Sequence, residues 1–187
     1  MRLFVAVEFE PEIKRALADL VAQMSGSRAD VKWVEGTNFH LTLYFLGEVT
    51  KERVADLNQV LSLASRSTNP FRLEVGGLGA FPSLARPRVL WVGAHGGEAL
   101  GRLQQRVAEQ VQGFAERPGE RQPFHPHVTL GRVRSGRGLA ELVGMVNELK
   151  DRKVGSQEVA DFALVESRLY RTGPVYTRVA RFALGSD

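Results

Sequence analysis

The chain has 187 residues, of which 43% are hydrophobic and 25% charged, a composition typical of a globular protein with one domain. It contains no cysteine, which excludes disulfides, thiolate metal sites and a cysteine nucleophile. The formal net charge of +4 is compatible with an anionic partner such as nucleic acid, although a solvated, arginine-rich surface explains so small an excess better.

The predicted elements alternate between strand and helix. In chain order they are a strand over 3–7, a helix over 11–24, strands over 31–34 and 39–46, a helix over 54–64, strands over 71–75 and 88–93, a helix over 98–116, a strand over 127–133, a helix over 139–149, and strands over 159–165 and 175–184. Glycines at 76, 77 and 79 predict a turn, and the sequence Arg-Pro-Gly at 117–119 ends the third helix. No linker divides the chain, so we expect one α+β domain over 1–187 with helices packed on mostly antiparallel sheet.

The sequence contains no segment typical of a membrane span or a signal peptide. The apolar run near the N-terminus is interrupted by Glu8 and Glu10, and no window approaches the ~20 apolar residues that a span requires. We therefore expect a soluble, cytoplasmic protein with no membrane partner.

The first of two His-x-Thr-x motifs lies on the predicted strand 39–46. Because side chains alternate between the faces of a strand, His40 and Thr42 share one face with Tyr44. The opposite face is fully apolar and is expected to face the core; it consists of Phe39, Leu41, Leu43 and Phe45. The polar pair is thus expected on a stiff strand, directed away from the core.

The second motif repeats this arrangement on the predicted strand 127–133. His127 and Thr129 share a face with Gly131, and Val128 and Leu130 take the opposite face. A glycine at this position permits close approach of a ligand or a neighbouring backbone. Each motif is followed by an amphipathic helix, which gives the two halves of the chain a weak internal symmetry.

Two imidazoles that meet across a groove form an acid–base pair. Histidine titrates near neutral pH, so one ring can accept a proton from an attacking oxygen while the other gives one to a leaving oxygen. Threonine hydroxyls beside the rings can donate to phosphate oxygens as charge develops. A single His-x-Thr is more often an ordinary polar stretch, but two in the same context favour catalysis. His95 and His125 lack this context and are expected to be structural or exposed.

At this point the chain resembles the 2H phosphoesterases, and within them the RNA 2′,3′-cyclic phosphodiesterases, also called 2′-5′ RNA ligases. The resemblance covers essentially the whole chain. The matching stretches are 2–7, 33–34, 38, 40–47, 81–82, 87–91, 124–132, 167–169 and 173–176.

The resemblance implies two pseudo-symmetric lobes, each a mostly antiparallel sheet with helices on its outer face, and a central groove that receives one motif from each lobe. It implies hydrolysis of RNA 2′,3′-cyclic phosphate ends to 2′-phosphate ends, with reversible, ATP-independent 2′-5′ joining as a second activity. His40 would be the general acid for the 3′-oxygen and His127 the general base for water, roles that spacing alone does not assign. Thr42 and Thr129 would hold the phosphate.

Arg132 is a further candidate for substrate binding. It lies five residues after His127, so regular alternation places it on the opposite face of the strand. A bulge near Gly131 would bring its guanidinium round to the phosphate, whereas without one it is a surface arginine. Trp33, Tyr44 and Phe124 are candidates for stacking on a base, although core packing is the simpler role for Trp33.

The predicted chemistry requires no cofactor and no metal, and the sequence shows no acidic ligand cluster. A metal site built on the two histidines lacks a third ligand at suitable spacing. The expected partner is RNA with a 2′,3′-cyclic phosphate end, tRNA fragments among them, or a cyclic nucleotide, and we expect a monomer. The alternative is a non-catalytic module that binds nucleotides or RNA ends in the same groove.

Overall fold

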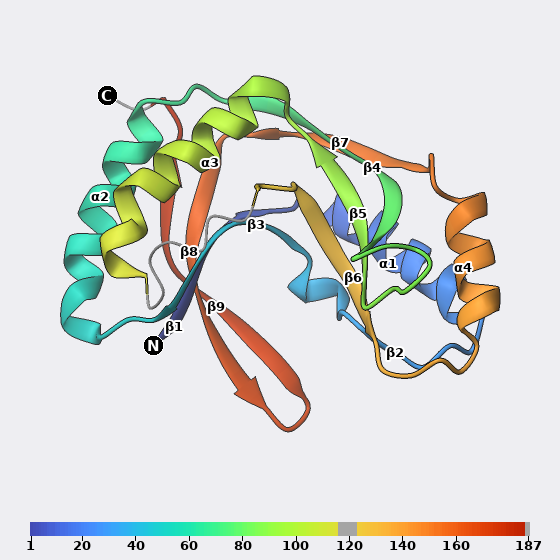
Figure 1. Cartoon of the computed structure of the whole chain (residues 1–187). Helices are drawn as coiled ribbons and strands as arrows, with labels where there is room; N and C mark the ends of the chain where they lie inside the picture. The colour runs from blue at the N-terminus through green and yellow to red at the C-terminus, as the bar shows by residue number, and fades with distance from the viewer. Residues whose placement is uncertain (116–122, 186–187) are drawn as a thin grey trace.

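Two antiparallel sheets form the framework of the protein. The structure is a computed structural model that describes residues 1–115 and 123–185. Sheet A has the strand order β3-β1-β8-β9, formed by His40–Glu48, Arg2–Glu8, Asp161–Tyr170 and Gly173–Ala183 (Figure 1). Sheet B has the order β2-β6-β5-β4-β7, formed by Val31–Trp33, His127–Val133, Val89–His95, Phe71–Phe81 and Lys153–Val159. The fold is therefore α+β, as predicted.

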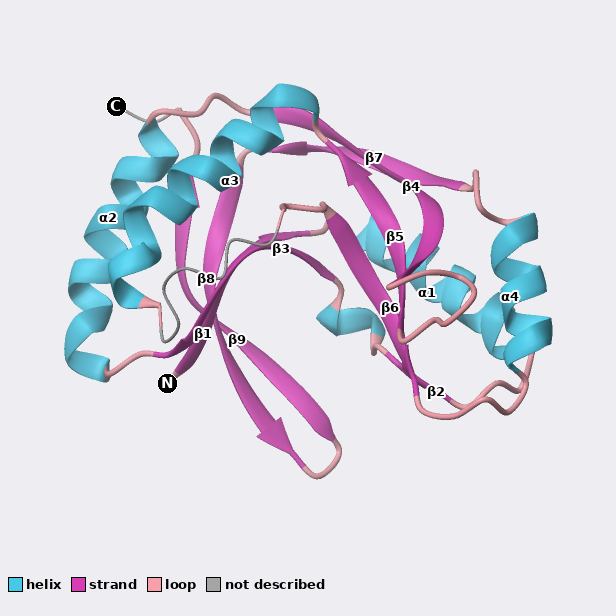
Figure 2. Ribbon diagram, in the orientation of Figure 1, coloured by secondary structure: helices cyan, strands magenta, loops and turns pink. Residues whose placement is uncertain are grey.

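Each sheet is covered by two helices on its outer face. Helices α2 (Val54–Arg66) and α3 (Gly97–Val111) pack on sheet A, and α1 (Pro11–Ser25) and α4 (Leu139–Glu148) pack on sheet B (Figure 2). Three short 3-10 helices complete the elements within the described residues: η1 (Gly36–Asn38), η2 (Lys51–Arg53) and η3 (Gln112–Phe114). We call the face of each sheet that carries no helix its inner face; the inner faces turn toward each other.

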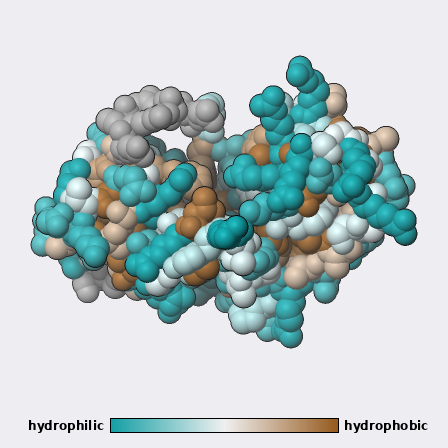
Figure 3. Space-filling model, turned by 90° about the horizontal axis from the view of Figure 1, so that it is seen from below, coloured by the Kyte–Doolittle hydropathy of each residue, from teal (hydrophilic) through white to brown (hydrophobic). Residues whose placement is uncertain are grey.

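Most apolar residues of the helices and strands build one large core, and Phe4, Ala6, Ala163 and Val165 form a second, smaller cluster on sheet A. In α1 the side chains at helical spacing, Ile13, Leu17 and Leu20, are buried against sheet B. The same buried cluster contains residues of both sheets, among them Leu41 of β3 and Val128 of β6. Burying one such side chain contributes roughly 1.5–3 kcal/mol, so the core fixes both motif strands firmly. Seen from below, apolar side chains show in the middle of a mostly hydrophilic face (Figure 3).

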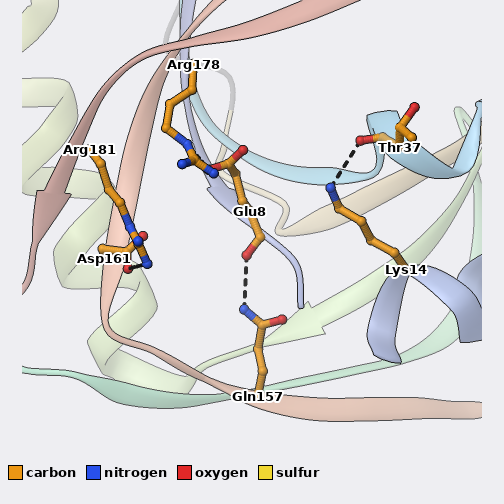
Figure 4. A network of polar contacts seen from close by, with 7 residues as sticks. All are labelled: Glu8, Lys14, Thr37, Gln157, Asp161, Arg178 and Arg181. Atoms are coloured by element: carbon orange, nitrogen blue, oxygen red, sulfur yellow. Dashed lines mark hydrogen bonds and ion pairs between the residues drawn. The ribbon is translucent and has the colours of Figure 1, made fainter. Parts of the chain in front are cut away.

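A polar clasp joins the two sheets where β1 ends. The amide of Gln157 on β7 donates to the backbone oxygen of Glu8 at 3.0 Å (Figure 4). It also accepts from the backbone N–H of Glu10 at 3.0 Å. The carboxylate of Glu8 also pairs with Arg178 of β9 at 2.7 Å. Because Glu8 is the β1 partner of His40, the clasp fixes the position of the first motif relative to sheet B.

We expect Gln157→Ala to lower the free energy of unfolding by about 1–3 kcal/mol. Gln157 is buried, and its loss leaves one backbone donor and one backbone acceptor without a partner. Urea denaturation followed by circular dichroism measures this effect. As the control, Gln105→Ala removes an exposed amide that bonds only to a neighbouring helix side chain, and it should change stability by less than about 0.5 kcal/mol. Equal stability of the two variants would contradict a structural role of the clasp.

The structure corrects several of the predicted boundaries. Strand β4 does not end at the expected turn but continues through Gly76, Gly77 and Gly79, with an irregularity in its pairing to β5 between Val75 and Leu78. The predicted strand 159–165 proves to be two strands, β7 and β8. The third helix ends at Val111 and passes into η3. The predicted end of that helix at residue 116 and the break at 117–119 lie outside the described residues.

The other predicted strands and helices are present within a few residues of their expected bounds. No helix in the described part of the chain is long and apolar enough to cross a bilayer.

Candidate active site

His40 and His127 each occupy the first position of a motif strand and point to the inner face of their sheet. Their neighbours Leu41 and Val128 are fully buried on the helix side, as the alternation predicts. Strands β3 and β6 contact each other, although they belong to different sheets. The charge of His127 also influences the titration of His40, so the two rings lie within electrostatic reach of each other. The structure thus brings together the two histidines that the sequence singled out.

The two imidazoles are held by equivalent hydrogen bonds. Nδ1 of His40 lies 2.7 Å from the backbone oxygen of Asn38, and Nδ1 of His127 lies 2.6 Å from that of His125. A carbonyl oxygen only accepts, so Nδ1 carries the proton in both rings. Nε2 is then the nitrogen available for proton transfer: it accepts when the ring is neutral and donates when the ring is charged.

An aromatic ring supports each histidine from the inner face of its own sheet. The ring of His40 lies 4.8 Å from Phe4 and 5.2 Å, edge-on, from Tyr176. The ring of His127 lies 4.9 Å, edge-on, from Phe81. These contacts fix the imidazole planes and also remove them partly from water.

Burial lowers the pKa of both histidines below the ordinary value. For His40 the hydrogen bond to Asn38 and the charge of Glu8 raise the pKa, whereas the charges of Lys14 and His127 lower it further. For His127 the bond to His125 likewise raises the pKa, whereas the charges of His125 and Arg132 lower it. In the free protein the neutral imidazole is therefore favoured at both positions.

Both motifs end in a β-bulge. In the pairing of β1 with β3, Ala6 lies opposite Thr42 and Val5 opposite Tyr44, so Leu43 has no partner of its own. In the pairing of β5 with β6, Trp91 lies opposite Thr129 and Leu90 opposite Gly131, so Leu130 is the extra residue. Each Thr therefore stays on the same face as its His, and the alternation reverses just after it.

Because of the bulge at Leu43, the next two residues lie on the opposite faces of the strand from those predicted. Tyr44, expected beside His40, packs against the core, and Phe45, expected in the core, is 70% exposed. Its ring lies 6.0 Å from that of Phe4, which places Phe45 on the inner face of sheet A. The sequence alone did not show this, because the bulge depends on pairing with β1.

Arg132 occupies the equivalent position after the bulge at Leu130. It is exposed, and its charge acts on His127 of its own strand. Burial raises the pKa of Tyr176 on sheet A, and the charge of Arg132 opposes this increase. The charge of Arg132 therefore acts on residues of both sheets.

The aromatic residues that the sequence suggests for base stacking all contact the core. Trp33, Tyr44 and Phe124 are partly buried and pack against the core. The same packing explains why residue 131 is a glycine, because a Cβ there would lie 2.6 Å from a methyl group of Val31 and 2.9 Å from the ring of Trp33. The space at this glycine is taken by side chains of β2.

The rings on the inner faces were not identified as site residues from the sequence. They are Phe4, Phe45 and Tyr176 on sheet A and Phe81 and Trp91 on sheet B. For Phe4 a signal was available, since it and Ala6 alternate with three buried aliphatic residues in the first strand. His95 and His125 are exposed, as expected. Across 1–115 and 123–185, no three His, Asp or Glu side chains gather closely enough to hold a metal ion.

Comparison with known families gives a match over most of the chain. The family model described as the 2′-5′ RNA ligase superfamily matches residues 9–170. The RNA 2′,3′-cyclic phosphodiesterase of Aeropyrum pernix is 43% identical over 161 residues, covering 86% of this chain and 90% of that protein. The protein of the same name from Archaeoglobus fulgidus is 37% identical over 176 residues, covering 94% of this chain and 96% of that protein.

Solved structures share the fold over nearly the full length. TT0787 of Thermus thermophilus superposes with a TM-score of 0.83 at 32% identity and covers 100% of both chains. E. coli LigT complexed with 3′-AMP superposes with a TM-score of 0.77 at 29% identity, covering 99% of this chain and 98% of that one.

Proposed function

The chain belongs to the 2′-5′ RNA ligase superfamily, and on this basis we propose that it is an RNA 2′,3′-cyclic phosphodiesterase that converts cyclic phosphate ends into 2′-phosphate ends. The observation that carries the proposal is the matched pair of imidazoles. Each is anchored through Nδ1 to the carbonyl two residues earlier, and each has a threonine two residues later on the same face.

In the proposed mechanism the two histidines act on opposite sides of the phosphorus. Nε2 of His127 takes a proton from water as the new bond to phosphorus forms. The bond from phosphorus to O3′ breaks, and Nε2 of His40 gives O3′ a proton, which leaves a 2′-phosphate and a 3′-hydroxyl. The two rings have equivalent hydrogen bonds and equivalent positions on their strands. The assignment of acid and base therefore follows the family resemblance.

Thr42, Thr129 and Arg132 are proposed to bind the phosphate. The hydroxyls lie beside the rings on the inner faces, where they can donate to the non-bridging oxygens as negative charge develops. Arg132 supplies a planar cation suited to two phosphate oxygens at once. Its electrostatic reach to Tyr176 on the other sheet supports a position above the reacting group.

We further propose that the same residues join RNA ends. When the 5′-hydroxyl of a second RNA replaces water, His127 deprotonates it, a 2′-5′ phosphodiester forms, and O3′ leaves as before. No ATP is needed, since the energy is already present in the cyclic phosphate. Support comes from the acid–base pair, which works in either direction, and from the family name.

The proposed substrate is RNA with a cyclic end, tRNA fragments included, or a cyclic mononucleotide. LigT of E. coli has been crystallised with 3′-AMP, phosphate, ATP and NADP+, and this supports nucleotide binding by the fold.

Product analysis with a short RNA that carries a 2′,3′-cyclic phosphate tests the function. We expect conversion to a 2′-phosphate end. A 3′-phosphate product would contradict the assignment of the leaving oxygen. Stable binding without turnover would instead favour the non-catalytic module that binds nucleotides or RNA ends.

The pH dependence should reflect the lowered pKa values of both histidines. The active form of the free enzyme has His40 protonated and His127 neutral, so kcat/KM falls on the alkaline side as His40 loses its proton and on the acid side as His127 gains one. Since burial lowers both pKa values, the maximum of kcat/KM should lie below about pH 6.5. A bound phosphate favours the imidazolium, so kcat should peak at higher pH than kcat/KM.

Steady-state kinetics from pH 4.5 to 8.5 with a cyclic mononucleotide provides the measurement. The residual activity of His40→Asn should lose the alkaline limb and keep the acid limb. If it loses the acid limb instead, the two roles are reversed.

A further inference from the structure

A pocket on the inner face of sheet B lies beside His127 and has no part in the mechanism above. It has a volume of about 410 Å³, within the range of roughly 300–1,000 Å³ usual for small-molecule sites. It opens between strands β4 and β5 and the segment that leads into β6. Its lining includes Trp91, Gly93, His95 and His125.

Glycine at position 93 allows close packing on one side of this pocket. On β5 the inner-face positions are Trp91, Gly93 and His95, and Gly93 is the partner of His127 in the sheet. A Cβ at Gly93 would lie 2.9 Å from the backbone oxygen of Gly76 and 2.9 Å from Nε2 of His95. A side chain at Gly93 would therefore collide with the neighbouring backbone and with the ring of His95, so glycine at this position allows the His95 ring to lie close beside the motif strand.

Three of the residues that line the pocket, Trp91, His95 and His125, carry flat aromatic rings. The indole of Trp91 lies 4.9 Å from the ring of His125, and Nε2 of His95 lies 3.3 Å from the backbone oxygen of Gly76. Flat rings around a cavity of this size suit a nucleobase, because every base has a face on which an aromatic ring can stack.

The position of the pocket relative to the phosphorus suggests which base it holds. If His40 protonates O3′, the ribose of the cyclic nucleotide lies toward sheet A, and the attacking oxygen approaches from the side of His127 on sheet B. For hydrolysis that oxygen belongs to water, which needs no pocket. For joining it belongs to the 5′-hydroxyl of a second RNA, whose first nucleoside must lie beside His127.

We propose that the pocket lined by Trp91, Gly93 and His95 binds the first nucleobase of the RNA that supplies the attacking 5′-hydroxyl. This proposal rests on the proposed joining reaction and on the acid–base assignment. It makes the pocket a determinant of whether the cyclic phosphate is transferred to RNA or to water.

Two substitutions of His95 separate joining from hydrolysis. His95 is exposed, so neither substitution should affect folding. We expect His95→Ala to lose one stacking surface and to reduce joining about tenfold, with hydrolysis of a cyclic mononucleotide within a factor of two of the unchanged protein. His95→Phe, which keeps an aromatic ring, should retain most of the joining activity. The control is Glu74→Gln. Glu74 is the residue of β4 that pairs with His95, it lies outside the pocket, and its substitution should affect neither reaction.

Fluorescence of Trp91 tests binding without any turnover. The chain has two tryptophans, so Trp33→Phe leaves Trp91 as the single reporter. A 5′-hydroxyl adenosine trinucleotide should quench it in a saturable manner, also with adenosine 2′-phosphate at saturation, and His95→Ala should weaken the binding about tenfold.

Three outcomes would overturn the proposal: no quenching, displacement of the trinucleotide by adenosine 2′-phosphate, or an equal loss of joining and hydrolysis in His95→Ala. The last two would mean that the pocket serves the cyclic nucleotide itself. Failure of the unchanged protein to hydrolyse a cyclic phosphate would contradict the proposed function instead. The fluorescence titration would still show whether the pocket binds the trinucleotide.

Discussion

His40→Ala and His127→Ala should each lower kcat for a 2′,3′-cyclic mononucleotide by about 10²–10⁴-fold, the usual contribution of a positioned general acid or base. Each substitution removes the Nε2 that the hydrogen bond at Nδ1 leaves available for proton transfer. The effects should not multiply in the double variant, since an acid–base pair works as a unit. Steady-state and single-turnover kinetics with one substrate give the comparison.

The fold of these variants needs a separate measurement, because both rings pack on aromatic neighbours. Urea denaturation should show that each variant is still folded under the assay conditions. If either histidine variant is folded and fully active, the proposed acid–base mechanism is contradicted. Full activity of one and complete loss of the other would point to a single essential histidine.

Thr42→Val and Thr129→Val should each reduce kcat by about 10²-fold with little change in KM. Valine keeps the shape and the β-branch of threonine but removes the donor that is proposed to act on the phosphate oxygens. Loss of one preorganised donor to a developing anion typically costs 10²–10³-fold in rate. The effect should appear in kcat, since the hydroxyl bonds strengthen as charge builds up in the transition state.

Serine variants at the same two positions are the matched controls. Thr42→Ser and Thr129→Ser keep the hydroxyl and should retain most of the activity. If the valine variants raise KM and leave kcat unchanged, the hydroxyls bind the ground state only. If serine fails as badly as valine, the methyl group and not the hydroxyl is what matters.

The sequence was sufficient to predict the fold class and the faces of both motifs. His40, Thr42, His127 and Thr129 lie where the alternation predicts, because the strands are regular up to each threonine. Past that point the prediction failed for Phe45, whose position depends on the bulge at Leu43. A bulge arises from pairing with another strand, so a single strand's pattern does not reveal it.

Longer-range features were also beyond the sequence pattern. Strand β4 continues through three glycines because β7 pairs with it up to Gly76 and β5 pairs with it again from Leu78 onward, whereas the local composition favoured a turn. The pocket beside His127 depends on Gly93 lying next to His127 across the sheet, and these residues are far apart in the chain. The bulge near Gly131, in contrast, is one of the two alternatives that the sequence leaves open for Arg132.

The two sheets are interleaved along the chain, so neither lobe is a continuous segment. Strands β1 and β3 of sheet A are separated by α1 and β2, which belong to sheet B, and α3 on sheet A connects two strands of sheet B. Many enzymes close over a substrate by rotating two domains about a hinge. Here the chain passes several times from one sheet to the other, and residues of both sheets share one core, so such a rotation is resisted. The distance between the two imidazoles is thus set when the chain folds, and heating should abolish activity and tertiary structure in a single transition.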